Sequence, residues 1–317
     1  MPLLTVFTAP KPFTNPHIAL IQRNALRSGR ALGPAVQIAL IGQEQGMTEV
    51  AREYGLLHLP EVQCNALGTP LVSSIFELGR SVNSSPFLAY VNADILLFPE
   101  TITAVEELGK RMERFLLVGQ RWDLEVKEAL DFSGDWAAAL RERMRRQGKL
   151  HVRAGSDYFI FPRECFTEIP PFSVGRAGWD NWMIYFARKQ GWPVVDGSGM
   201  LDVIHQSHDY SHLPNGQPHY RLPETGENIR LAGGRRTIFT LDDATHEWEN
   251  GNLRPVHITT RRFFRGLEVF PLLKHGNYAL TQALFSLFHP RRAFKERQRQ
   301  RAMAQAAAQS EGNQGGI

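Results

Sequence analysis

Continuous apolar runs alternate with helical patterns through the N-terminal part of the chain. The runs predict buried strands at 3–8, 36–41, 56–59, 87–91 and 115–118. Between them, apolar residues at helical spacing predict helices, the first starting at Asn15-Pro16 and others starting at Thr48, near Leu71 and at Pro99. Buried strands separated by helices are typical of a parallel sheet covered on both faces. The pattern therefore predicts an α/β fold with a mostly parallel, Rossmann-like central sheet flanked by helices.

The pattern changes from about Asp123 onward. It predicts a charged helix, a strand emerging from a turn, a second helix, a short strand, a glycine turn and an ordered functional loop that is a candidate lid. In that order these are Trp136–Gln147, Gly155–Pro162, Asp180–Gln190, Pro193–Val195, Gly197–Gly199 and residues 205–228. We expect one domain over 1–250, a basic amphipathic helical extension over 251–304 and a disordered tail over 305–317.

Charge is distributed unevenly along the chain. Residues 261–301 hold ten Lys and Arg and two Glu, a net charge of +8, whereas the whole chain carries +4. The remaining residues therefore sum to −4. A mildly acidic body does not favour nucleic-acid binding by overall charge, so a nucleic acid is not expected as a partner.

The basic segment also carries an apolar face. Four of its apolar residues share one side of a predicted helix, and three cations follow them: Leu280, Leu284, Leu287 and Phe288, then Arg291, Arg292 and Lys295. This pattern fits an interfacial helix on an anionic membrane. It fits equally a C-terminal helix that packs on the body and leaves its basic end in water. Nucleic-acid binding by this segment is a third, less favoured interpretation.

Several classes are excluded or disfavoured by what the sequence lacks. No window of 18 apolar residues occurs, so we expect no membrane-spanning helix. The first residues, Met1–Thr8, have no basic or long apolar region of the kind found in signal peptides. The chain has two cysteines, Cys64 and Cys165, which form no CxxC pair. This small number of cysteines favours a reducing, intracellular setting. Neither GxxxxGK(S/T) nor GxGxxG after a strand is present, which disfavours P-loop NTPases and dinucleotide dehydrogenases.

The first candidate for chemistry follows the predicted strand at 87–91. In Tyr90-Val91-Asn92-Ala93-Asp94, Asp94 stands at the carboxyl end of a buried parallel strand, where open α/β sheets bind ligands. A carboxylate there can hold a divalent cation that neutralises a diphosphate. The alternative is that Asp94 is an ordinary turn or capping residue.

The second candidate is the box Gly178-Trp179-Asp180-Asn181-Trp182. Tryptophan faces pack against sugar rings, and Asp180 at a helix start could accept a hydroxyl proton as general base. The alternative is an N-cap aspartate with two core tryptophans.

The third candidate is the run from Asp202 to His212, which contains three His and two Asp. Imidazole with carboxylate suits Mn²⁺ or Zn²⁺ better than Ca²⁺. The alternative is a polar surface loop. The HExxH motif of zinc proteases is absent.

These elements, in this order along the chain, resemble the nucleotide-diphospho-sugar transferase superfamily of GT-A type. The resemblance rests on the opening Phe7-Thr8-Ala9-Pro10, the motif ending at Asp94, the Trp-Asp-Asn-Trp box and a His after the last strand. Residues Gly155–His212 are most similar to family-2-like bacterial glycosyltransferases.

The resemblance implies a role for each matching residue. Asp94 would be the acidic metal ligand, with Asn92 replacing the first Asp of the family motif. His205 or His208 would complete the metal site, and His208 is favoured because Asp209 follows it. Asp180 would be the general base. The donor would contact Thr8, Ala9, Pro10, Asn92, Asp94 and Asp157, and the acceptor sugar would lie against Trp179, Asn181 and Trp182. Arg153 would face phosphate or be a surface arginine.

The implied function is a metal-dependent glycosyltransferase using Mn²⁺ or Mg²⁺. It would move a sugar from a nucleoside-diphosphate sugar to a glycan or lipid-linked acceptor. Two alternatives remain: a sugar-nucleotide nucleotidyltransferase, which the lack of glycine in Thr8–Pro12 disfavours, and a non-catalytic nucleotide- or carbohydrate-binding protein. The expected location is cytoplasmic, with peripheral attachment to the inner face of the membrane through 261–301.

Overall fold

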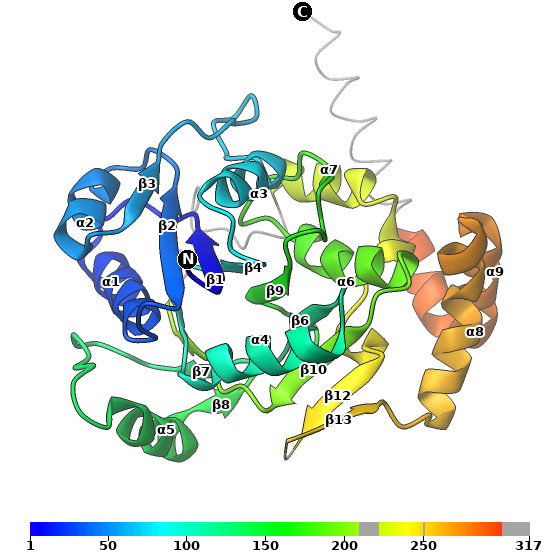
Figure 1. Cartoon of the computed structure of the whole chain (residues 1–317). Coiled ribbons are helices and arrows are strands. Elements are labelled where there is room, and N and C mark those ends of the chain that lie inside the picture. Colours follow the sequence, from blue (N-terminus) through cyan, green and yellow to red (C-terminus); the bar gives the residue numbers. More distant parts are fainter. Residues whose placement is uncertain (209–221, 250, 300–317) are drawn as a thin grey trace, which may run out of the picture. The chain divides into compact units, whose positions relative to one another are not determined.

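A large sheet organises the first part of the chain. The computed structural model in Figure 1 describes residues 1–208, 222–249 and 251–299, which fall into two compact units divided after Val256. Within the described residues, the main sheet contains β1 (Leu4–Thr8), β2 (Val36–Ile41), β3 (Leu57–Leu59), β4 (Phe87–Val91), β6 (Leu116–Val118), β9 (Tyr158–Pro162), β10 (Val194–Gly199), β12 (His246–Glu249) and β13 (Asn252–Pro255).

The strand order is β13-β12-β10-β6-β9-β4-β1-β2-β3. Strand β9 runs antiparallel to its neighbours β4 and β6, and β13 runs antiparallel to β12. The other neighbouring pairs are parallel. The predicted α/β fold with a mostly parallel sheet is therefore confirmed.

Helices cover both faces of this sheet. The α-helices described in the first unit are α1 (Pro16–Arg30), α2 (Met47–Tyr54), α3 (Val72–Ser81), α4 (Glu100–Arg111), α5 (Trp136–Gln147), α6 (Trp179–Lys189) and α7 (Pro223–Leu231). Of these, α5 packs not on the main sheet but on a smaller sheet, through Leu140 and Met144. As predicted, α1 begins after Asn15, whose side chain accepts hydrogen bonds from the backbone N–H groups of His17 and Ile18.

Alternate residues of the strands meet different helices. Phe7 and Tyr90 pack against Phe76 of α3, and Tyr90 also contacts Trp179 of α6. The intervening strand residues, such as Val6 and Ala89, belong to a second core cluster that includes residues of α1 and α4. This alternation follows from the two-residue period of a strand buried on both faces, and Figure 1 shows α3 and α6 across the sheet from α4.

A second, four-stranded sheet lies next to the first. It contains β5 (Ile95–Leu96), β7 (Trp122–Leu124), β8 (Lys149–Leu150) and β11 (Ile204–Gln206), in the order β5-β11-β7-β8. His205 of β11 pairs with Ile95 on one side and with Asp123 on the other. Because Ile95 directly follows Asp94, this register brings a histidine from late in the chain to the end of β4.

Three predictions about chain organisation are corrected. Gly197–Gly199 is not a turn but the end of β10, and a Cβ at Gly197 would lie 2.7 Å from Leu117 Cδ1, so a side chain there would displace Leu117. The predicted loop over 205–228 contains β11 and the start of α7. The first unit continues past residue 250, because β13 pairs with β12.

Parts of the earlier predictions fall on residues outside the described ranges. The central part of the predicted lid, with Asp209 and His212, lies there, and so does the predicted disordered tail at 305–317.

The second unit is helical. It contains α8 (Thr260–His275), α9 (Tyr278–Phe288) and a further helix over the described residues 290–299. Across the described ranges, no helix combines the length and apolar character needed to cross a membrane.

Candidate metal and donor site

Asp94, His205 and His208 converge at the carboxyl end of β4. His208 Nε2 lies 3.0 Å from Asp94 Oδ2, and His205 Nε2 lies 3.8 Å from the same oxygen. One potential ligand atom from each residue lies within 4.8 Å of the others. The three groups that the resemblance assigned to a metal site are therefore brought together by the fold, and two imidazoles with a carboxylate suit a first-row divalent cation.

The donor atoms of this triad have room for a further partner. Asp94 Oδ1 is buried and has no hydrogen-bond partner among the described residues. Thr8 Oγ1, at the end of the adjacent strand β1, is also buried without a partner among them. A buried polar atom without a partner is costly unless a ligand satisfies it. The residues present thus fit a cation and a polar ligand at this edge of the sheet.

Positive groups keep Asp94 ionised. Burial acts to raise the pKa of Asp94, but the hydrogen bond with His208 and the charges of His205 and Lys11 outweigh it and lower this pKa well below its ordinary value. Lys11 Nζ lies 3.4 Å from His208 Nε2. Burial lowers the pKa of Lys11, while the Asp94 carboxylate acts in the opposite direction. The charges of Lys11 and Asp94 therefore each favour the ionised form of the other.

Asp123 orients the first histidine. Its Oδ1 lies 3.1 Å from His205 Nδ1, and its Oδ2 lies 2.7 Å from His151 Nδ1. A carboxylate that accepts a hydrogen bond from Nδ1 keeps the proton on that nitrogen and leaves a lone pair on Nε2. Metal-ligating histidines use this arrangement. His205 Nε2 points to Asp94. Burial lowers the pKa of His205, but the hydrogen bond to Asp123 prevails and the net shift is upward.

An arginine joins this acid to a second one. Arg121 forms ion pairs with Asp123 and Asp157. Asp157 Oδ1 accepts a hydrogen bond of 2.7 Å from Asn92 Nδ2, and the Asn92 backbone N–H donates to the Asp157 carbonyl over 2.9 Å. Asn92 thus holds Asp157 in place through its side chain and its backbone.

The Trp-Asp-Asn-Trp box lies at the start of α6. Asp180 is in the first turn, where its Oδ1 accepts from the backbone N–H of Gly178 over 3.2 Å. Burial, with a contribution from the charge of Asp157, raises the pKa of Asp180 to about 6. The charge of Asp157, which is paired with Arg121, thus links Asp180 electrostatically to the group around Asp123. Asn181 Nδ2 donates to the carbonyl of Phe239 over 2.7 Å.

The two tryptophans are core residues. Trp179 and Trp182 are each 5% exposed, and other aromatic rings cover them: Tyr90 and Phe159 around Trp179, Phe172 and Phe186 around Trp182. The prediction that their faces form a sugar-binding wall is corrected, because covered rings cannot stack on a ligand.

Other predicted residues have mixed placements. Pro10 is buried, Ala9 is partly exposed, and both follow β1 at the edge that carries Asp94. Arg153 pairs with Asp196 at 2.6 Å and Asp242 at 3.0 Å. Its guanidinium is therefore committed to two carboxylates rather than placed for a phosphate.

Four residues of the site were not predicted: Lys11, Arg121, Asp123 and His151. A signal existed for Asp123, which interrupts the apolar pair of Trp122 and Leu124 in a short strand. Lys11 carried none beyond its position after the first strand.

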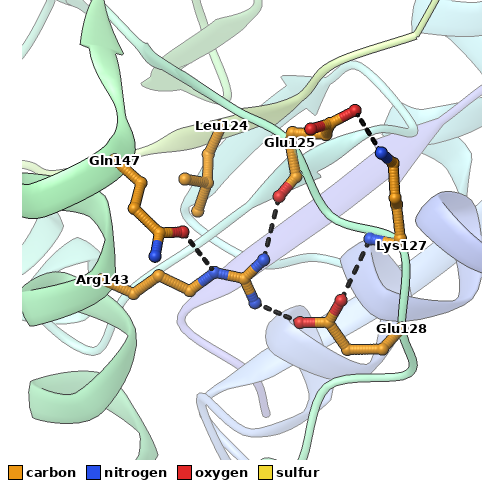
Figure 2. Close-up of a pocket in the computed structure, with 6 residues that line it drawn as sticks. All are labelled: Leu124, Glu125, Lys127, Glu128, Arg143 and Gln147. Atoms are coloured by element: carbon orange, nitrogen blue, oxygen red, sulfur yellow. Dashed lines mark hydrogen bonds and ion pairs between the residues drawn. The ribbon is translucent and has the colours of Figure 1, made fainter.

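A surface pocket of another kind lies between β7 and α5. Figure 2 shows its lining residues, Leu124, Glu125, Lys127, Glu128, Arg143 and Gln147. Its charges satisfy one another: Arg143 pairs with Glu128 and donates to the Glu125 carbonyl, and Lys127 pairs with Glu125 at 2.8 Å. None of the predicted site residues lines it, so we do not assign the chemistry there.

Comparisons with known proteins give matches at the level of structure. No protein-family model matches the chain, and no curated protein matches it. A solved mannosyltransferase of Pyrobaculum calidifontis, PcManGT, in complex with GDP-Man and Mn²⁺, is 13% identical, with a TM-score of 0.40 over 66% of this chain and 58% of its own. TarS of S. aureus is 11% identical, with a TM-score of 0.31 over 40% and 38%.

A third match is glucosyl-3-phosphoglycerate synthase of Mycobacterium tuberculosis, in complex with Mn²⁺, UDP and phosphoglyceric acid. It is 13% identical, with a TM-score of 0.45 over 74% of this chain and 80% of its own. The alignments with the first two proteins span less than two thirds of their lengths. The first of these proteins is a mannosyltransferase by name.

Proposed function

We propose that the protein is a metal-dependent glycosyltransferase that takes a sugar from a nucleoside-diphosphate donor. The observation that carries the proposal is the convergence of Asp94, His205 and His208 at the carboxyl edge of a parallel sheet, the edge where such sheets bind ligands. Lys11 adds a positive charge at the same edge, which suits a diphosphate. The acceptor is a glycan or a lipid-linked molecule.

Each group has one task in this proposal. Asp94, His205 and His208 would hold Mn²⁺ or Mg²⁺, which when bound supplies charge to stabilise a diphosphate leaving group. Lys11 binds the same diphosphate. Thr8, with its unpartnered hydroxyl, contacts the donor beside it.

Asp180 serves as general base if the transfer inverts the configuration at the anomeric carbon of the sugar. Its carboxylate takes the proton of the acceptor hydroxyl as the acceptor oxygen bonds to the anomeric carbon. The bond from that carbon to the diphosphate oxygen breaks, and the nucleoside diphosphate leaves with the electron pair. A pKa near 6 leaves Asp180 mostly ionised at neutral pH yet basic enough to accept a proton.

A thermal-shift screen of UDP, GDP, CDP and dTDP, each with and without Mn²⁺, tests the proposal. We expect one nucleotide to raise the unfolding temperature of the full chain by several degrees when Mn²⁺ is present, because a ligand that binds only the folded state stabilises it. Asp94→Asn should abolish that shift, since it removes the negative ligand.

Asp131→Asn, at an exposed acid remote from the triad in sequence, is the matched control and should keep the shift. Equal nucleotide shifts in the wild type and in Asp94→Asn, with or without Mn²⁺, would contradict the proposed site. Nucleotide binding without transfer or donor hydrolysis would favour a non-catalytic binding protein.

A further inference from the structure

The second unit shows a helical hairpin with two apolar sides. Helices α8 and α9 are joined by Gly276 and Asn277, and Phe264 near the start of α8 contacts Phe288 at the end of α9. The two helices are therefore antiparallel. Buried contacts on the inner side include Val269, Leu272 and Phe285.

A second set of apolar residues in the hairpin faces outward. Phe263, Leu267 and Phe270 on α8 are 54%, 45% and 54% exposed, and Leu280 and Leu287 on α9 are 48% and 71% exposed. We call these five residues the hairpin face. The residues on α8 have the spacing i, i+4 and i+7, and those on α9 have the spacing i and i+7. Residues at these spacings lie along one side of a helix.

The two stripes lie on one side of the hairpin. Each residue of an α-helix is rotated by about 100° about the helix axis from the one before it. On α8, the three exposed residues lie about 60–120° around the axis from Phe264. On α9, Leu280 and Leu287 lie about 80–100° from Phe288, in the same sense of rotation. In an antiparallel pair whose contact runs through Phe264 and Phe288, equal rotations point to the same face. The exposed apolar residues therefore form one surface.

Most charges of the second unit are positive, and its two described acids are not fully exposed: Glu268 is buried and Glu296 is half-buried. Residues 257–299 contain two acids, Glu268 and Glu296. Glu268 is 1% exposed and pairs with Arg265 and with His289, so it presents no negative charge to solvent. The exposed cations of the same residues are Arg261, Lys274, Arg291, Arg292, Lys295, Arg297 and Arg299.

We infer that the hairpin face docks on an anionic lipid bilayer. A helix such as α9, which has no charged residue from Tyr278 to Phe288 yet exposes two leucines, is poorly suited to water. Apolar residues that enter the headgroup region, in a unit with many exposed cations and with its described acids buried or half-buried, are a combination that holds a protein on a negatively charged membrane surface. The charge selects an anionic bilayer over a neutral one.

Vesicle co-sedimentation of the full chain tests this inference. The wild type should bind vesicles of phosphatidylcholine with roughly a third phosphatidylglycerol at least about tenfold more tightly than pure phosphatidylcholine vesicles, and added salt should weaken the binding. The triple variant Phe263→Gln, Leu267→Gln and Phe270→Gln should bind anionic vesicles about tenfold more weakly, because glutamine keeps the helix but removes the apolar side chains.

A charge variant and two controls complete the test. Arg291→Glu with Arg292→Glu should also weaken binding to anionic vesicles. Leu67→Gln, at a leucine 71% exposed in the first unit, and Arg145→Glu with Lys149→Glu, at exposed cations of the first unit, should leave it unchanged. Unfolding temperatures establish that each variant is folded.

Two outcomes would overturn the inference. One is vesicle binding that the triple variant leaves intact. The other is absence of vesicle binding together with a wild-type dimer, by analytical ultracentrifugation, that the triple variant dissociates, since the hairpin face would then bind a second copy of the chain.

Discussion

Asp123 illustrates how one residue can decide the state of a neighbouring site. It lies behind His205, not among the three candidate ligands, and shares its two oxygens between His205 and His151. Through His205 it holds one imidazole in a single tautomer and orientation.

Asp123→Asn should therefore weaken Mn²⁺ binding about 10–100-fold, the usual effect of removing a carboxylate behind a ligating histidine. Calorimetric titration of the full chain with Mn²⁺ alone measures it without any assumption about substrate. The control is Asp135→Asn, at the exposed N-cap of α5, which should leave the affinity unchanged. An unchanged affinity in Asp123→Asn would mean that His205 is not a ligand.

Asp180 gives a prediction about stability and pH. Its pKa in the folded protein is raised from 3.8 to about 6 by burial, with Asp157 adding to the effect. Near pH 4 and below, the carboxyl of Asp180 is protonated in the folded protein, which is the form that burial favours. As the pH rises from 4 toward 6, Asp180 ionises in the unfolded chain before it ionises in the folded protein. This favours the unfolded state, so the wild type loses stability that Asp180→Asn, which has no carboxyl at this position, does not lose.

We expect the unfolding temperature of Asp180→Asn, minus that of the wild type, to rise by about 2–4 °C between pH 4 and pH 7.5. This corresponds to about 1 kcal/mol after allowance for the partial exposure of the group. Differential scanning calorimetry measures it. Asp131→Asn, whose acid has a lowered pKa because Ser133 donates to it, should show no such rise. A flat difference for Asp180→Asn would show that the carboxyl titrates normally.

At the scale of elements, the fit of α3 against β1 depends on one small residue. Gly79 of α3 faces Phe7 of β1, and a Cβ at this glycine would lie 2.5 Å from Phe7 Cγ. Phe7 is fully buried and its ring packs against those of Phe76 and Tyr90, so a shift of Phe7 would disturb these contacts.

Gly79→Ala should lower the free energy of unfolding by about 1–3 kcal/mol, the usual cost of overpacking a core. Gly226→Ala in α7, where nothing lies within 4 Å of the added Cβ, is the matched control. It should be neutral or stabilise by about 0.5–1 kcal/mol, because alanine restricts the unfolded chain. Urea unfolding of both variants compares them, and equal stability would show that α3 does not pack as described.

The contrast between the two variants also bears on the site. The same face of the sheet carries Tyr90, which leads along β4 to Asn92 and Asp94, so a displaced α3 acts on the strand that presents the acid.

At the scale of the whole molecule, chemistry and charge are divided between the two units. All the candidate site residues precede residue 209, whereas residues 257–317 hold ten Lys and Arg against three Glu. The first unit is thus negatively charged overall at pH 7, and the positive net charge of the chain comes from the second.

A chain ended after Val256 should keep the Mn²⁺ affinity of the full chain within about twofold, because no candidate ligand is removed. It should also lose retention on a cation exchanger at pH 7, since its net charge becomes negative. Titration calorimetry and ion-exchange chromatography measure the two effects. A shortened chain that is folded but binds Mn²⁺ much more weakly would show that the second unit contributes to the site.

The sequence by itself determined the α/β class and most elements of the main sheet, because continuous apolar runs and helical stripes are local properties. The predicted strands at 36–41 and 87–91 and the helix Trp136–Gln147 agree with the structure to the residue. It also singled out Asp94, His205 and His208, because a strand-end acid and a histidine-rich run are visible without coordinates.

Only the tertiary structure decided which of these groups meet. The pairing of β11 with β5 and β7 places His205 beside Asp94 and Asp123, and no spacing along the chain encodes that register. Likewise, burial separated the aromatic residues by location: Trp179 and Trp182 are enclosed by other rings, whereas Phe263 and Phe270 face outward. Local patterns specify which residues can bury or bind, but contacts between distant segments determine which of them do.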